Sequence, residues 1–150
     1  AIVVEVPRSD LVFAVPEALN PYDNEPPDIN GDGVQLYVRT QEGDAGWLLL
    51  PIAGTDVVRV RRIESWSAAP VANEPIAATW QPKGAGYVMR IDIPGDAVPA
   101  ALDVIVNEMP RGRERRRGQL VMSGAAREFT YLRGDRHEPA RLVPLRLIDA

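Results

Sequence analysis

The pattern D-x-N-x-D-G over residues 28–33 places Asp28, Asn30 and Asp32 at alternate positions. Oxygen ligands at this spacing can converge on Ca²⁺, and glycine permits the sharp turn that such a loop needs. The full EF-hand pattern requires a glutamate at its twelfth position, which is Arg39 here, and a strand-like pattern begins at Val34 where a helix would follow. The segment therefore predicts an Asx-rich turn that leads into a strand, with a calcium site as the alternative.

His137 is the only histidine, and Asp135 lies two residues before it. A Ser-His-Asp site also needs a serine nucleophile, and no serine of this chain lies in a G-x-S-x-G elbow. Because the sequence contains no cysteine, thiolate metal sites and cysteine nucleophiles are excluded. The carboxylates Asp92, Asp96 and Glu108 are acid–base candidates whose separation the sequence does not fix. We expect that the chain is not an enzyme.

The densest basic segment covers residues 111–117. Arginines can bind phosphate or carboxylate, but no aromatic residue interleaves the run, so stacking on bases is not indicated. The chain as a whole has a formal net charge of −4. A nucleic-acid-binding domain usually has a basic excess, so we expect no nucleic-acid partner and interpret the run as a solvated loop.

The tryptophans fall into two groups. Trp47 and Trp80 lie in strand-like runs and are expected in the core, because a buried aromatic ring contributes a large apolar area. Trp66, Phe129 and Tyr131 lie at loops or strand ends. Exposed aromatic rings stack on the faces of sugars, so these three are candidates for a carbohydrate platform.

Short apolar or alternating runs, separated by many of the 14 prolines and 12 glycines, make up most of the chain. Period-2 alternation with frequent turn signals is typical of an antiparallel β-sandwich or barrel. No apolar run approaches the roughly 20 residues of a membrane-spanning helix. We expect one all-β domain over residues 1–150. Its expected strands cover 2–6, 11–15, 34–39, 47–52, 58–63, 76–81, 87–93, 102–106, 119–122, 128–132 and 142–148.

Two segments read as long loops, 17–29 and 65–75, and long loops in compact domains often carry function. Residues 97–103 have the composition of a helical turn, although Pro99 restricts it.

Several strands together resemble the family 9 carbohydrate-binding modules and their DOMON-type relatives. Residues 32–38 resemble the family's D-x-V-E-[LI]-[FY]-[IV] strand, and residues 86–94 resemble its G-Y-x-x-E-x-x-I-P strand. Residues 102–108 followed by 117–123 resemble its V-N-D…G-x-[LI]-x-W-S pair. The resemblance implies a jelly-roll-like antiparallel sandwich with immunoglobulin-like layers. It also implies a non-catalytic accessory domain of a larger protein in an extracellular or periplasmic setting.

In that family, further strands precede the segment that residues 2–6 resemble. The resemblance therefore implies that this sequence is part of a longer protein, with an N-terminal edge strand left open. A partner chain or an oligomer is expected to cover that edge.

The family's binding residues carry over in part. The family's first sugar-stacking tryptophan corresponds to Ile29, and its hydroxyl-binding glutamate corresponds to Gln35, whereas Asp32 keeps its place. The second tryptophan aligns with Phe129 or Tyr131. Haem-binding relatives use axial methionine, histidine or lysine, for which this chain offers Met89, Met122 and His137.

We thus expect a glycan-binding accessory domain. Its aromatic platform comes from Trp66, Phe129 or Tyr131. The amides of Gln35 and Asn107 bond sugar hydroxyls, with Arg133 assisting. The alternative is a structural or protein-interaction sandwich whose sugar site has degenerated.

Overall fold

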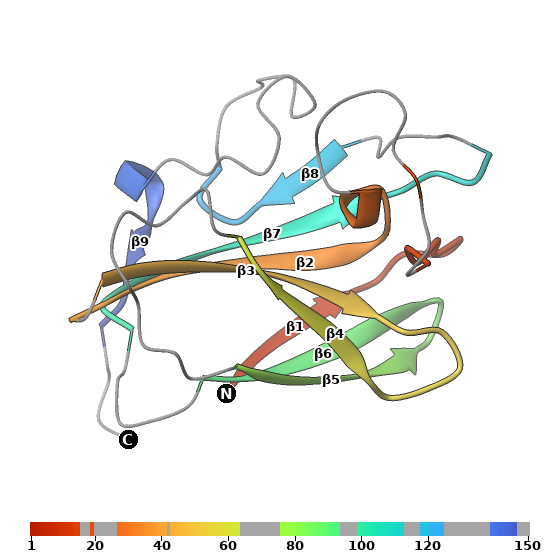
Figure 1. Ribbon diagram of the computed structural model, residues 1–150, viewed down its shortest axis with the longest axis horizontal. Helices are drawn as coiled ribbons and strands as arrows, with labels where there is room; N and C mark the ends of the chain where they lie inside the picture. Colours follow the sequence, from red (N-terminus) through yellow and green to blue (C-terminus); the bar gives the residue numbers. More distant parts are fainter. Residues whose placement is uncertain are drawn as a thin grey trace.

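The computed structural model describes residues 1–15, 19, 27–41, 43–63, 76–93, 99–112, 118–124 and 139–146. These residues form two antiparallel sheets that pack face to face (Figure 1). The prediction of an all-β antiparallel sandwich is confirmed. No helix in these ranges is long and apolar enough to cross a membrane.

The smaller sheet has three strands in the order β1-β6-β5, and the larger sheet has the order β4-β3-β2-β7-β8, with β9 also paired to β7. The strands of the small sheet are β1 (Ile2–Val6), β5 (Ala77–Lys83) and β6 (Gly86–Asp92). The strands of the large sheet are β2 (Gly33–Thr40), β3 (Gly43–Pro51), β4 (Val58–Arg62), β7 (Ala101–Glu108), β8 (Gly118–Val121) and β9 (Val143–Pro144). Two short 3₁₀ turns, η1 (Pro27–Ile29) and η3 (Pro139–Arg141), precede β2 and β9.

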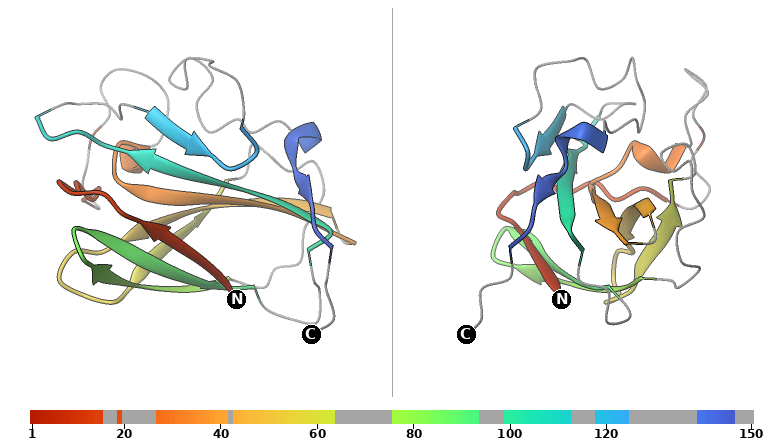
Figure 2. Two further views of the ribbon diagram at one scale, coloured as in Figure 1. Left: turned by 180° about the vertical axis from the view of Figure 1, so that it is seen from behind. Right: turned by 90° about the vertical axis from the view of Figure 1, so that its left-hand side faces the viewer.

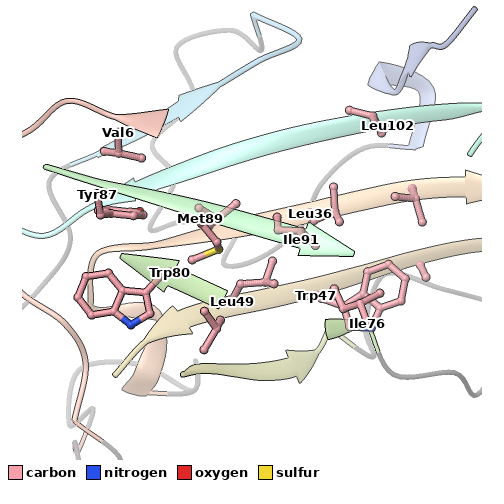
Figure 3. Close-up of a cluster of buried hydrophobic side chains, with 14 residues drawn as sticks. Val6, Leu36, Trp47, Leu49, Ile76, Trp80, Tyr87, Met89, Ile91 and Leu102 are labelled. Atoms are coloured by element: carbon pink, nitrogen blue, oxygen red, sulfur yellow. The ribbon is translucent and has the colours of Figure 1, made fainter. Parts of the chain in front are cut away.

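The main core lies between the sheets (Figure 3). Alternate residues of β2, such as Leu36, face Met89 and Ile91 of β6 across it, as strand periodicity requires. Trp47 and Trp80 are both buried there, which confirms their predicted place in the core.

The opposite face of the large sheet is buried as well. Tyr37, Leu48, Leu50 and Ile105 form a second apolar cluster on that side. Alternation like that of residues 34–39 is also typical of a strand with one solvent-exposed face, and among the described strands β1 and β5 of the small sheet have such a face. There Glu5 pairs with Lys83 at the surface.

Main-chain pairing between the two sheets occurs along one side only in the described residues. Val57, just before β4, forms an isolated bridge with Thr79 of β5. The backbone N–H of Trp80 also donates to the Asp56 carbonyl at 3.1 Å. Strand β1 is at the other end of the small sheet, away from this junction (Figure 2).

Three sequence expectations were wrong or only partly right. Residues 11–15 form no strand, because the main chain of Val12 bonds to Asp32 instead of to a sheet, and Phe13 packs edge-on against Trp80, with ring centroids 5.0 Å apart. A helical turn does not extend over 101–103, because β7 begins at Ala101. Of the expected strand 142–148, the described part shows only the two residues of β9. The strand 128–132 and most of both long loops lie outside the described residues.

The junction between β1 and the β5–β6 hairpin allows a direct test. A Cβ atom added to Gly86 would overlap the Val6 carbonyl oxygen, a backbone atom held by the β1–β6 pairing. We expect Gly86→Ala to lower the free energy of unfolding by about 3 kcal/mol or more, as overpacking against a fixed backbone does. Urea denaturation monitored by tryptophan fluorescence measures the loss.

Gly84→Ala is the matched control. Gly84 has a positive φ of 58° but open space around it, so its substitution should cost only about 1–2 kcal/mol, through backbone strain. Equal losses for the two variants would contradict the overlap at Gly86.

Candidate functional site

A cluster of amide side chains lies on the outer face of the large sheet, the face turned away from the small sheet. Gln35 Nε2 donates to Asn107 Oδ1 at 3.2 Å, and Gln119 Nε2 donates to the same oxygen at 2.8 Å. The Tyr37 hydroxyl donates to Gln35 Oε1 at 2.8 Å. We call these four residues the amide cluster.

Strand register explains why these side chains meet. Asn107 of β7 is directly opposite Gln119 of β8. On its other side Asn107 is opposite Gly33 of β2, and Gln35 is two residues further along β2 on the same face. Cross-strand and diagonal neighbours share a face of the sheet and lie within reach of long side chains. The structure therefore brings together Gln35 and Asn107, which the sequence had nominated separately.

Asn107 keeps one unused hydrogen-bonding group. Its Oδ1 accepts two amide hydrogens, which fixes the orientation of the carboxamide, and its Nδ2 is buried without a partner. Gln35 and Asn107 are each only 1% exposed. Leaving a buried donor unpaired costs about 1–3 kcal/mol, so such a group calls for a specific explanation.

The other part of the predicted sugar site lies elsewhere in the chain. Trp66, Phe129, Tyr131 and Arg133 are all outside the described residues, as is His137. The aromatic platform therefore stays a prediction. Of the two methionines considered for haem, Met89 is fully buried between the sheets and Met122 is exposed after β8.

Asp32 connects three parts of the fold at the start of β2. Its carboxylate accepts hydrogen bonds from Arg8, from the Val12 N–H at 2.5 Å and from the Met109 N–H at 3.3 Å. Burial raises the pKa of the Asp32 carboxyl, and these three donors oppose that rise. Burial raises the pKa of the nearby Tyr87 hydroxyl too, and the charge of Asp32 adds to that effect.

Asp28 is held by arginines of β4. Arg61 binds its two carboxylate oxygens at 2.9 and 3.1 Å, and Arg59 lies 3.7 Å away. Asp28 and Asp32 thus have different arginine partners. No group of three or more His, Cys, Asp or Glu residues suited to a metal occurs in the described ranges. These contacts favour the turn over the cation for Asp28, Asn30 and Asp32, and the calcium site stays a prediction.

Sequence reasoning missed a second buried polar group on the same outer face. Asp103 of β7 is fully buried and accepts hydrogen bonds from the Ser123 hydroxyl at 2.5 Å and the Ser123 N–H at 3.0 Å. Asp103 and Asn107 alternate along β7 with the apolar Val104 and Val106, and this alternation was the available signal.

The chain matches no protein-family model, no curated protein and no solved structure. The amide cluster must therefore be interpreted from its own geometry.

Substituting Gln35 by glutamate, the residue of the resembled family, tests the burial of the cluster. Among the described residues that bond to one another in the amide cluster none is a cation, so burial should raise the folded pKa of a glutamate there above its unfolded value of about 4.3. When the pH is below the folded pKa, the protonated glutamic acid at position 35 can still donate to Asn107 and accept from Tyr37. We expect Gln35→Glu to match the wild type in stability near pH 4 and to be about 2 kcal/mol less stable at pH 7.

Gln81→Glu is the control, because Gln81 is exposed on β5. Denaturant midpoints of both variants, each compared with the wild type at the same pH, make the measurement. A Gln35→Glu penalty that does not change with pH would contradict the burial of this side chain.

Proposed function

We propose that this chain is a non-catalytic carbohydrate-binding accessory domain, with the amide cluster as the hydrogen-bonding floor of its ligand site. The observation that carries the proposal is the meeting of Gln35, Asn107 and Gln119 around one oxygen while Asn107 Nδ2 stays unpaired.

Carboxamides suit this role because each one both donates and accepts, as a sugar hydroxyl does. A hydroxyl oxygen that accepts from Asn107 Nδ2 would satisfy the donor that the fold leaves unpaired. The cluster carries no formal charge, which favours a neutral ligand over an anionic one. Binding of this kind needs no chemistry on the ligand.

A structural role is the second candidate, and the burial of the cluster favours it. Because Gln35 and Asn107 are 1% exposed, a sugar reaches them only if the groups above them move. In this alternative the amides only tie β2, β7 and β8 together, and the chain is a structural or protein-interaction sandwich with a degenerate sugar site.

Titration with a panel of soluble oligosaccharides, monitored by tryptophan fluorescence, tests the proposal. We expect a saturable change with at least one glycan. We also expect about tenfold weaker binding by Asn107→Ala, since the hydrogen bonds lost are worth about 1–1.5 kcal/mol.

Arg90→Ala is the matched control, because Arg90 lies exposed on the small sheet, where it pairs with Asp92. Its affinity should equal that of the wild type. If a glycan array and the titration both show no binding, and Asn107→Ala changes only the unfolding midpoint, the structural alternative holds.

A further inference from the structure

We infer that the side of the sandwich between β1 and β8 accepts an extended β-strand from another polypeptide, one with apolar side chains at alternate positions. This surface is separate from the amide cluster and does not depend on the carbohydrate proposal.

The first observation is the unequal width of the two sheets. The large sheet runs five strands across from β4 to β8, while the small sheet has three. The sheets are joined where β5 meets the start of β4, so the deficit falls at the opposite side, beyond β1. Figure 2 (left) shows that side, with β1 below β7 and β8.

The second observation is an uncovered apolar side chain on the inner face of the large sheet. Leu120 of β8 is directly opposite Val106 of β7, whose side chain packs on the core between the sheets. Directly opposite residues share a face, so Leu120 also points to the inner side. It is nevertheless 74% exposed, which is the result expected where the small sheet lacks a strand.

The third observation identifies the kind of occupant. The β5–β6 hairpin closes through Lys83 and Gly86 around a two-residue turn, so these two residues are a hydrogen-bonded pair. In an antiparallel ladder the backbone groups of successive residues point to opposite neighbours. The backbone N–H and C=O groups of Tyr87, Met89 and Ile91 therefore point toward β1. Their β1 partners are residues 6, 4 and 2, so the N–H and C=O groups of Val3 and Glu5 point away from the sheet.

This edge lacks the usual protection against strand addition. Within the described residues β1 pairs only with β6, and it contains no proline, glycine or inward-facing charge. Val3 is 62% exposed, and the Glu5 carboxylate lies on the solvent-exposed face of the small sheet, where it pairs with Lys83. Backbone groups of this kind are satisfied by another strand, and the inner side chains of that strand would cover Leu120.

A second copy of this chain fits the surface less well. Antiparallel pairing of β1 with its counterpart would place both small sheets in one plane and both large sheets on the same side. Because the large sheet extends past β1, the two β8 strands would then collide. A single added strand avoids this collision, whereas a second sandwich does not.

The test uses the whole chain and a short synthetic peptide of alternating valine and threonine with lysines at its ends. We expect the peptide to shift the backbone NMR signals of β1 and β8 and to protect the Val3 and Glu5 amides from hydrogen exchange. Val3→Pro removes one outward N–H without touching the β1–β6 bonds, and should weaken binding at least about fivefold. Val3→Thr, which keeps the N–H, should bind like the wild type.

Leu120→Lys supplies a second variant, which remains informative if Val3→Pro does not fold. This variant should also bind the peptide more weakly, because it removes an apolar side chain from the inner face without altering β1. If the folded Val3→Pro variant and the Leu120→Lys variant each bind the peptide as tightly as the wild type, the inference is overturned. The inference is also overturned if the peptide shifts only the NMR signals of β4, or if the protein forms a dimer through β1 that the peptide does not dissociate. Sugar titrations of these variants should match the wild type whatever their outcome with the peptide.

Discussion

The pairing of β2 with β7 at the centre of the large sheet is the constraint on which the rest of the structure depends. Apart from the exposed Arg39, the residues of both strands are buried or part-buried on both faces, so their side chains must suit one of two interiors. Val34, Leu36 and Val38 supply the apolar interior that the small sheet covers. Gln35 and Asn107 instead supply polar groups to the other side, where burial demands hydrogen bonds between them.

Asp32 extends this constraint to the chain before β2. A carboxylate that burial disfavours keeps its place because Arg8 and two backbone N–H groups bond to it. Those bonds hold the segment after β1 across the end of the sandwich, where Phe13 packs on Trp80 and Tyr87. The same bonds explain why residues 11–15 form no strand despite their apolar composition, since the backbone of Val12 is committed to Asp32.

Short apolar or alternating runs between turn signals were enough to locate β1, β2, β6 and β8 within a few residues and to indicate the fold class. It could not reveal that the outer face of the large sheet is buried, because Gln35 and Tyr37 are the residue types that a solvated face would also carry. The pairing of Gln35 with Asn107 depends on the register between strands 72 residues apart, which no local pattern encodes. The arginine partners of Asp28 and Asp32 likewise come from distant strands and loops, so the local D-x-N-x-D-G pattern could not distinguish a cation from an ion pair.

The two proposed surfaces use opposite faces of the same two strands. Asn107 and Gln119 face outward on β7 and β8, whereas their neighbours Val106 and Leu120 face the inner side. Strand β8 has four residues and, in the described part of the chain, is hydrogen-bonded to β7 alone. A strand seated beneath Leu120 would add apolar contacts to β8. Gln119 of β8 donates to Asn107 Oδ1, and this bond helps to set the direction of the unpaired Asn107 Nδ2 donor. Strand β8 therefore contributes to both proposed surfaces, through Gln119 on the outer face and Leu120 on the inner side.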